Sequence, residues 1–354
     1  MHGRIPAAAR RAGFATPDVV PELLREYGAA TRRAVEHYLA AERPAPYLHD
    51  LLTDYPRRGG KMMRPAICIA NARAFGARLE DAVRSAAAIE LLHNALLIHD
   101  DIEDGSDLRR GRPALHKLHG IPRAINAGDA LLLLALRPLL DNRGALGQPL
   151  SLRILEQTQA MARETAEGQA LELGWRDGGA TDVTEADYLT MVLKKTAWMA
   201  TIWPAQIGVL IGGRGETDPG RVVRFGFFLG ATFQILDDLL NLTADRAYGK
   251  ELNGDLYEAK RTLMLIHARR TCGDGERDQI DAFLALRREE RTPGQIGWLA
   301  GLMARLGSID YARTVAEALA GAAEHEFALA YGHLPPSPDK DFIAGLIPWV
   351  FERI

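Results

Sequence analysis

The chain has 354 residues, of which 47% are hydrophobic, and its 43 lysines and arginines nearly balance its 46 aspartates and glutamates. This length is enough for one large domain or two ordinary ones with a sizeable buried core. A net charge of −3 provides no overall basic surface, so binding to nucleic acid by bulk electrostatic attraction is not expected. Any recognition of phosphate groups must therefore be local.

Short sequence patterns exclude two further classes of protein. Cys68 and Cys272 are the only cysteines and stand far apart, without a metal-ligand spacing, which favours a reducing compartment. The longest apolar run, residues 130–136, is far shorter than the roughly 20 residues that span a bilayer. We therefore predict a cytoplasmic protein without a transmembrane segment.

The first 17 residues contain arginines but no acidic residue and no apolar signal core. A weak organelle-targeting segment has this composition, and so does a frayed terminal tail. We predict a disordered N-terminal tail over residues 1–17.

Apolar residues recur at three- and four-residue spacing along most of the remaining chain, which predicts α-helices. Strand-like alternation is almost absent, and turn-rich breaks such as residues 57–60 and 212–220 separate the helices. No long linker or repeat of the solenoid type is present, so we predict a single all-α domain over residues 18–354. In chain order, the predicted helices cover residues 20–40, 64–76, 80–104, 123–140, 150–173, 185–211, 220–243, 256–270, 278–288, 294–306 and 309–330.

Five acidic residues stand between residues 99 and 107, at the end of a strongly apolar helix pattern. On a helix Asp100 and Asp104 lie one turn apart with Asp101 beside them, so their charges repel. A solvated acidic face is the alternative, but the apolar residues upstream favour a cleft. Oxygen ligands without histidine or cysteine clusters favour Mg²⁺ over Zn²⁺. Glu103 and Asp107 lack the ligand spacing and are expected to be solvated or paired with arginine.

The same spacing recurs in FQILDDLLN, residues 233–241, where Asp237 and Asp238 end a second apolar helix. Asn241 takes the position where a third acid would complete the pattern. Two acid-ended helices that face each other would enclose several Mg²⁺ ions, and these ions would hold a polyphosphate.

Cationic residues stand close to both acidic motifs in the sequence. Arginine offers forked donors for phosphate oxygens, and lysine offers a movable point charge. His93 lies two helical turns before Asp100, so it reaches the same cleft or is a core histidine. Gln169 and Glu172 form a further polar wall or an exposed face. The cationic residues, with the adjacent threonine, are Lys61, Arg64, Arg109, Arg110, Arg112, Lys195, Thr196, Lys250, Lys260 and Arg261.

These segments resemble, in their order, the trans-polyprenyl diphosphate synthases, the head-to-tail prenyltransferases that include farnesyl and geranylgeranyl diphosphate synthases. The resemblance covers residues 45–270 by motif. It implies an isoprenoid-synthase helical bundle around a central active-site cavity, usually in a homodimer. It rests on GGKMMRP, ELLHNALLIHDDIEDGSDLRRGRPALH, the GQ before an acid, KTA, FQILDDLLN and GK…GDLYEAKRT.

The resemblance also implies a role for each matching residue. Magnesium, with manganese as a substitute, would bind to Asp100, Asp101, Asp104, Asp237, Asp238 and Asn241. The allylic diphosphate would contact Arg109, Lys195 and Lys250, with Lys260 close by. The headgroup of isopentenyl diphosphate would contact Lys61, Arg64, His93 and Arg110, while Thr196 and Gln234 would steady the developing carbocation.

Product length follows from the residues before the first motif. Ala95 and Leu96 lie about one turn below Asp100, where farnesyl synthases tend to carry bulky aromatic residues. The small side chain of Ala95 would leave the floor of the active-site cavity open to a longer prenyl tail. We therefore expect a C20 product, geranylgeranyl diphosphate. A C15 product, a product of C25 or longer, a class I terpene cyclase and a non-catalytic subunit of a heteromeric synthase are the alternatives.

Overall fold

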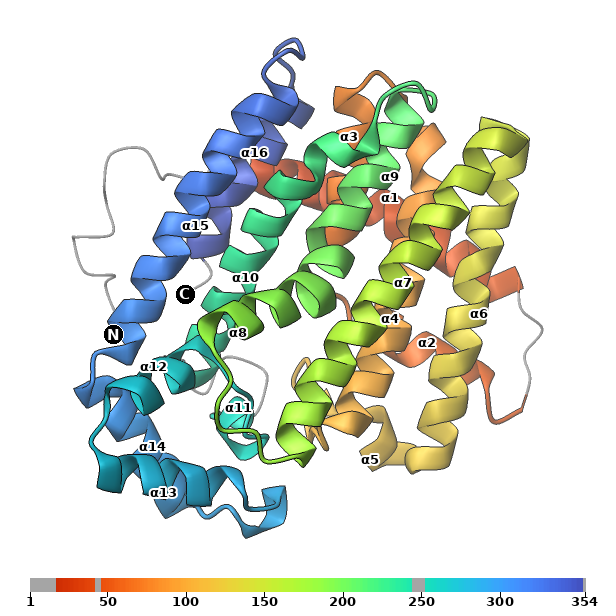
Figure 1. Ribbon diagram of the computed structural model, residues 1–354. Helices are drawn as coiled ribbons and strands as arrows, with labels where there is room; N and C mark the ends of the chain where they lie inside the picture. Colours follow the sequence, from red (N-terminus) through yellow and green to blue (C-terminus); the bar gives the residue numbers. More distant parts are fainter. Residues whose placement is uncertain (1–16, 42–45, 244–251, 353–354) are drawn as a thin grey trace.

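Long α-helices form nearly all of the regular structure in the computed structural model, which describes residues 17–41, 46–243 and 252–352 (Figure 1). The predicted all-α class is confirmed. The first half contains α1 (Val19–Ala41), α2 (His49–Arg57), α3 (Met63–Ala74), α4 (Leu79–Glu103), β1 (Leu108–Arg109), β2 (Arg112–Pro113), α5 (Leu115–His119), α6 (Ile121–Leu146) and α7 (Gln148–Asp177). The second half contains α8 (Glu185–Val192), the π-helix η2 (Leu193–Ile202), α9 (Trp203–Gly212), the 3₁₀ helix η3 (Pro219–Val222), α10 (Val223–Thr243), α11 (Gly254–Tyr257), α12 (Leu263–Thr271), α13 (Asp274–Leu284), the 3₁₀ helix η5 (Arg288–Glu290), α14 (Pro293–Arg305), α15 (Ser308–Tyr331) and α16 (Pro338–Phe351).

The structure departs from the predicted helices in a few places. Helices α2 and α16 were not predicted, and each contains an internal proline, Pro56 and Pro348, close to its C-terminal end. The single helix predicted over 256–270 is wrong, because Ala259 adopts a left-handed conformation (φ 54°) and separates α11 from α12. This break places Lys260 in a connecting segment rather than on a helix face.

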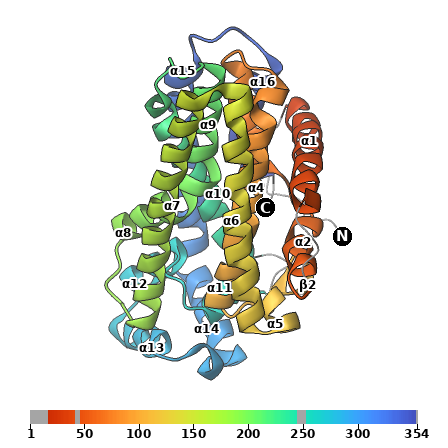
Figure 2. The ribbon, with the colours of Figure 1, turned by 90° about the vertical axis from the view of Figure 1, so that its right-hand side faces the viewer.

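Two helices, α4 and α10, lie within the bundle and carry the two acidic motifs at their C-terminal ends. Helix α4 packs against α3 and α6, whereas α10 packs against η2 and α15 (Figures 1 and 2). Alanines occupy much of the buried face of α4, and their small side chains let the neighbouring helices approach closely. These buried alanines are Ala82, Ala86, Ala87, Ala88 and Ala95.

The C-terminal end of α4 is an unfavourable place for acidic residues. The helix ends at Asp104, whose backbone N–H donates to the carbonyl of Asp100, and Gly105 follows with φ 65°. The partial negative charge at a helix C-terminus disfavours carboxylates by roughly 0.3–1 kcal/mol each. Such a conflict with local preference is typical of a functional site.

One connected cluster of buried hydrophobic side chains extends from Val20 to Val350 and includes members of most helices. That residues 18–354 form a single domain stays a prediction, which this core supports. The predicted tail over residues 1–17 lies outside the described residues except for Pro17. No helix in the described part of the chain has the length and apolar character needed to cross a membrane.

Candidate active site

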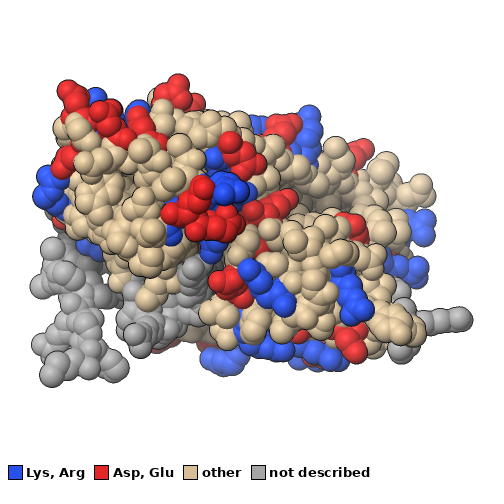
Figure 3. Space-filling view, turned by 90° about the horizontal axis from the view of Figure 1, so that it is seen from below, with Lys and Arg blue, Asp and Glu red and all other residues tan. Residues whose placement is uncertain are grey.

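A cavity of about 1490 Å³ lies between α3, α4, α7, η2 and α10. Along α4 it is lined by Asp100, then by Leu96 and Leu92 one and two turns deeper. The same end of the molecule gathers acidic and basic side chains next to one another (Figure 3). The cavity thus combines a charged mouth with an apolar interior.

The three acids of the first motif have different surroundings. Asp100 lines the cavity and lies 3.3 Å from the ammonium nitrogen of Lys195. Asp104 is 4% exposed and accepts hydrogen bonds from Arg176 Nη1 and Lys260 Nζ, both at 3.0 Å. Although burial opposes ionisation, Lys195, Lys260 and Arg109 hold the pKa of Asp100 below its ordinary value. Asp100 is therefore ionised at neutral pH.

Asp101 is fully buried and holds Arg109. The Nε of Arg109 donates to both carboxylate oxygens of Asp101, at 2.9 and 3.1 Å, and its Nη2 reaches Asp100 at 3.4 Å. The hydroxyl of Tyr55 donates to the same carboxylate of Asp101. These bonds fix Arg109 beside the Asp101 carboxylate, and the metal-binding role of Asp101 stays a prediction.

The second motif brings Asp237 and Asp238 to the same cavity. Asp238 accepts hydrogen bonds from Gln234 Nε2 at 2.6 Å and from the hydroxyl of Tyr188 at 2.8 Å. Burial, together with the nearby charges of Asp255 and Asp237, raises the pKa of Asp238 to about 8. The protein around Asp238 therefore disfavours its charged form.

Asn241 does not line the cavity in this structure. Its amide Oδ1 accepts a hydrogen bond from the backbone N–H of Asp255 at 3.0 Å, and its backbone carbonyl accepts from the N–H of Asn253 at 3.2 Å. These bonds place Asp255 at the cavity wall. Asp255 was missed by the sequence analysis, although it belongs to the GDLYEAKRT segment that the resemblance used.

That the carboxylates of the two motifs converge on metal ions stays a prediction. Among the described residues, no three histidine, cysteine or acidic side chains lie close enough together to hold a metal ion. Protein groups already bind several of the carboxylates. Lys260 Nζ, for example, contacts Asp104 at 3.0 Å, Glu258 at 2.7 Å and Asp255 at 3.6 Å.

Lys195 and Thr196 reach the cavity from the π-helix η2. Lys195 pairs with Glu172 of α7 as well as with Asp100, and Thr196 Oγ1 donates to Gln234 Oε1 at 2.8 Å. Burial alone would lower the pKa of Lys195, but Glu172 and Asp100 raise it above its ordinary value. The ammonium group of Lys195 is therefore charged at neutral pH.

Glycines on both sides let the wide π-helix fit between its neighbours. A Cβ atom at Gly168 of α7 would overlap the backbone nitrogen of Lys195. On the opposite side, Cβ atoms at Gly226 and Gly230 of α10 would lie 2.9 Å from Ile202 and 2.7 Å from Ala197. The sequence analysis missed this arrangement, because the three glycines come against η2 only in the folded chain.

We expect Gly168→Ala to displace Lys195 and to lower kcat for prenyl transfer by about tenfold to a hundredfold, because small misplacements of catalytic groups have effects of that size. Gly174→Ala, on the same helix, is the matched control. A Cβ at Gly174 would have no neighbour within 4 Å. Steady-state kinetics together with thermal melts measure both variants. A folded Gly168→Ala variant with unchanged kcat would show that η2 adjusts without moving Lys195.

The four residues assigned to the isopentenyl headgroup lie on a common stretch of the cavity wall. Lys61, Arg64, His93 and Arg110 all line it, together with the buried carboxylate of Glu90. Burial lowers the pKa of His93 to about 4, and the charge of Arg64 acts in the same direction. The imidazole is therefore neutral near pH 7 and serves as a hydrogen-bonding group rather than as a cation.

The remaining predicted residues fall inside and outside the cavity. Leu96 lines it, but Ala95 is fully buried and does not, so the expectation that Ala95 forms the floor is not supported by its position. Arg112 is exposed and pairs with Asp54 at 3.4 Å. Asp107 pairs with Lys117 rather than with an arginine, at 2.8 Å.

Some of the other residues named from the sequence also have clear positions. Glu103 accepts a hydrogen bond from Gln169 at 2.6 Å, and both side chains line the cavity. Arg261 lines the cavity and donates to the backbone carbonyl of Ala180 at 2.9 Å. Lys250 lies outside the described residues.

Comparison with known proteins decides the family. The sequence model of the polyprenyl synthetase family matches residues 45–296. The chain belongs to the polyprenyl synthetase family. This polyprenyl synthetase is therefore a prenyltransferase, a head-to-tail prenyl diphosphate synthase, and the terpene cyclase and non-catalytic subunit alternatives are set aside.

The relatives of this polyprenyl synthetase make products of different lengths. A geranylgeranyl diphosphate synthase of Sulfolobus acidocaldarius is 33% identical over 284 residues, which cover 80% of this chain and 84% of that protein. A geranylfarnesyl diphosphate synthase of Natronomonas pharaonis is 31% identical and covers 95% of this chain and 98% of its own length. Identity alone therefore does not fix the product.

A solved structure supports the fold of this polyprenyl synthetase. The crystal structure of a polyprenyl synthase from Caulobacter crescentus, complexed with calcium and isoprenyl diphosphate, superposes with a TM-score of 0.82 at 26% identity. The match covers 95% of this chain and 98% of that chain. Family membership implies a divalent metal and prenyl diphosphate substrates for this chain as well.

The side chains of this polyprenyl synthetase fit a hard divalent cation. Asp100, Asp237, Asp238 and Asp255 offer only oxygen donors, which magnesium and calcium prefer. Burial and then the charge of Asp255 raise the pKa of Asp238, so its carboxylate form has no compensating positive charge from the protein. A bound divalent cation would supply that missing positive charge.

Proposed function

We propose that this chain is a magnesium-dependent geranylgeranyl diphosphate synthase, which condenses isopentenyl diphosphate with dimethylallyl, geranyl or farnesyl diphosphate. The observation that carries the proposal is the cavity itself, in which Asp100 and Asp237 on two helices lie at the mouth of a deep apolar interior. Manganese is expected to replace magnesium. The alternatives of a C15 product and of a product of C25 or longer are outcomes of the same assay.

The charged mouth supports the departure of the allylic diphosphate. Bound Mg²⁺, held by Asp100, Asp237, Asp238 and Asp255, would neutralise the diphosphate and favour ionisation of its C–O bond. Arg109, Lys195 and Lys260 of this chain would hold the same group as its negative charge grows, and Lys250 is proposed to join them. Such preorganised charges commonly supply the largest share of the rate enhancement.

The interior protects the allylic cation that this ionisation leaves. Leucines and methionines line much of the cavity, including Leu92, Leu96, Met191 and Met199, and this apolar lining would help to exclude water. Thr196 and Gln234, which are joined by a hydrogen bond and both line the cavity, are proposed to steady the cation.

The second substrate then forms the new bond. Lys61, Arg64, His93 and Arg110 would hold isopentenyl diphosphate with its double bond facing the cation. The double bond attacks the cation, a proton leaves the adjacent carbon for the released diphosphate, and the new alkene completes one elongation.

The experiment that tests this proposal sizes the products. Purified protein is incubated with isopentenyl diphosphate, Mg²⁺ and each allylic diphosphate in turn, and the dephosphorylated products are separated by chain length. A predominant C20 alcohol is expected. A product of another length would correct the proposed specificity, and the absence of product from every pair would refute the proposed activity.

Leu96 is expected to limit chain length, because it lines the cavity while Ala95 does not. A phenylalanine at Leu96 fills space that the growing tail needs, so Leu96→Phe should shift the main product by at least one C5 unit toward C15. The matched variant Ala95→Phe overpacks the core instead and should lower stability by about 1–3 kcal/mol. Product sizing and thermal melts of both variants measure this. A shorter product from Ala95→Phe but not from Leu96→Phe would show that Ala95, and not Leu96, limits the chain length.

We further propose that the protein is a homodimer whose interface is the outer face of α6. Figure 2 shows α6 on the outside of the bundle. Large apolar side chains are exposed along it at helical spacing, and such a contiguous apolar face is typical of an interface. They are Ile121 (51%), Ile125 (43%), Leu133 (69%), Leu136 (41%) and Leu140 (42%).

A charge placed in this face should separate the subunits. Leu133→Glu is expected to halve the mass measured by sedimentation velocity at micromolar concentration. Leu329→Glu, at an equally exposed leucine of α15 (63%), should leave the mass unchanged. A dimeric Leu133→Glu variant would place the interface elsewhere.

The cytoplasmic location is also part of the proposal. Cys68 and Cys272 are both free and buried, which suits a reducing compartment.

A further inference from the structure

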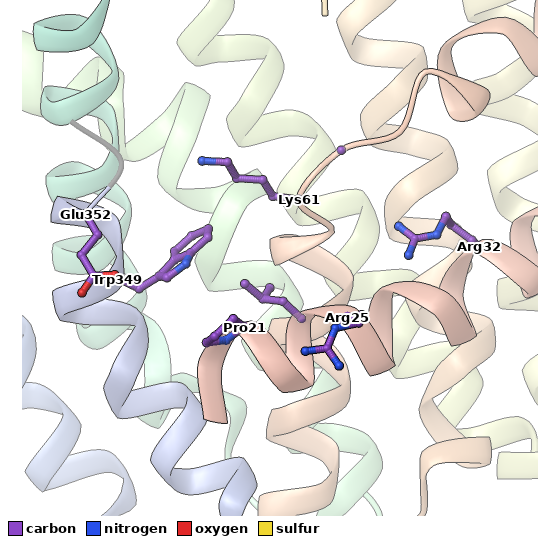
Figure 4. A pocket seen from close by; sticks show the side chains of 8 residues that line it. Pro21, Arg25, Arg32, Lys61, Trp349 and Glu352 are labelled. Atoms are coloured by element: carbon purple, nitrogen blue, oxygen red, sulfur yellow. The ribbon is translucent and has the colours of Figure 1, made fainter. Parts of the chain in front are cut away.

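A second pocket adjoins the cavity. It has a volume of about 420 Å³ and lies between the first half of α1, the loop before α3 and the end of α16 (Figure 4). Gly60, Lys61 and Trp349 line both spaces. We call it the outer pocket.

Positive charge dominates the outer pocket. Arg25, Arg32 and Lys61 line it, and the one acidic residue among its lining side chains is Glu352. Among the described residues, no carboxylate lies within ion-pair distance of Arg25 or Arg32. This contrasts with the cavity, where Arg109, for example, is bonded to acidic side chains.

The two arginines stand on one face of α1. Arg25 and Arg32 stand seven residues apart, two turns along one face of the helix and about 10 Å from each other along its axis. Gly28 lies between them, where a Cβ would be 3.1 Å from the Cβ of Met62. The lack of a side chain at Gly28 therefore brings α1 against the segment that carries Lys61.

Lys61 connects the outer pocket with the isopentenyl headgroup pocket. Its ammonium nitrogen lies 5.4 Å from the centre of the Trp349 ring, which forms part of the wall of both spaces. On the cavity side, a Cβ at Gly60 would lie 3.0 Å from a guanidinium nitrogen of Arg110. The positive charges thus continue from the surface of α1 to the interior.

We propose that the outer pocket binds a diphosphate group and captures isopentenyl diphosphate before it enters the headgroup pocket. Guanidinium groups without an acidic partner bind phosphate oxygens well, and a row of like charges raises the local concentration and the association rate of an anionic ligand. The capture step rests on the proposed function, whereas the binding of the anion does not. Inorganic diphosphate, the other product of the reaction, shares the chemistry and serves as a probe.

The first arm of the test measures binding without catalysis. Isothermal titration of the metal-free full-length protein with inorganic diphosphate compares the wild type with Arg25→Ala/Arg32→Ala. The double variant should bind about one equivalent less than the wild type. Arg33→Ala, at an exposed arginine on the same helix that does not line the pocket, should match the wild type. Equal stoichiometry and affinity in all three proteins would refute the site.

The second arm measures capture. The double alanine variant should lower kcat/KM for isopentenyl diphosphate by about five- to tenfold at low ionic strength, with kcat and the KM of the allylic substrate unchanged. The loss should shrink in about 0.5 M salt, where charges are screened within a few ångströms. Arg25→Lys/Arg32→Lys keeps the charge and should restore most of kcat/KM, which separates loss of charge from loss of structure.

The outcomes separate the two proposals. Lost binding with unchanged kcat/KM would refute capture. A wild-type protein that makes no product would refute the proposed function, while the titration would still decide the site.

Discussion

Replacing Asp100 by asparagine is expected to lower kcat for prenyl transfer about a thousandfold at saturating Mg²⁺. Asp100 is the residue of the first motif that lines the cavity, and it lies 3.3 Å from Lys195 and 3.4 Å from Arg109. Asparagine keeps the shape but removes a charged metal ligand and the partner of two cations. Losses of 10²–10³ are typical when one preorganised charge contact is removed.

The control for this variant is Asp107→Asn, in the same acidic segment. Asp107 is exposed and pairs with Lys117 outside the cavity, so its loss should leave kcat within about twofold. Steady-state and single-turnover kinetics, with Mg²⁺ titrated to saturation, compare the two proteins. An Asp100→Asn enzyme within tenfold of the wild type would contradict the assigned role.

Replacing Lys195 by alanine is expected to lower kcat by about a hundredfold to a thousandfold. The substitution removes a cation that faces the leaving diphosphate and also leaves Asp100 and Glu172 without their shared partner. Because the raised pKa of Lys195 keeps it charged, the effect should hold across the neutral pH range.

Its neighbour in sequence provides a close control. Lys194 points away from the cavity and pairs with Glu164 and Glu167 of α7, at 2.7 and 2.6 Å. Lys194→Ala should therefore retain near-normal kcat and show at most a small loss of stability, since exposed ion pairs contribute about 0–1 kcal/mol. Single-turnover rates decide between the two lysines, and equal losses in both variants would mean that the substitutions act through η2 rather than through the charge of Lys195.

The sequence predicted the long helices and the residues at the mouth, because both depend on local spacing. Asp100 and Asp237 follow apolar helix patterns, and helices of that kind must bury their apolar face while their ends reach a cleft. The different contacts that the acidic residues make within each motif could not be predicted from the sequence. Asp101 turns toward Arg109 and Tyr55, a residue of α2 that no local pattern connects with it.

The parts that were missed depend on contacts between distant segments or on unusual backbone. The π-helix has no distinctive sequence period, and its place depends on Gly168 and Gly230 from two other helices. Helix α16 begins with a proline after a turn-rich segment, so its apolar helix pattern was not recognised in the sequence. Its Trp349 nevertheless lines the cavity. The bond between Asn241 and the backbone of Asp255 could not be deduced from sequence position alone, and the metal-binding role of Asn241 stays a prediction.

The ion pairs at the mouth have a thermodynamic consequence for ligand binding. Arg109, Lys195 and Lys260 are each satisfied by an acidic side chain before any ligand arrives. A divalent cation must compete with them for the carboxylates, and a diphosphate must compete with the carboxylates for the cations. When both ligands bind, each releases the groups that the other needs, so the affinities for metal and diphosphate rise together by the same factor. The mouth therefore responds to the two ligands as a single cooperative unit.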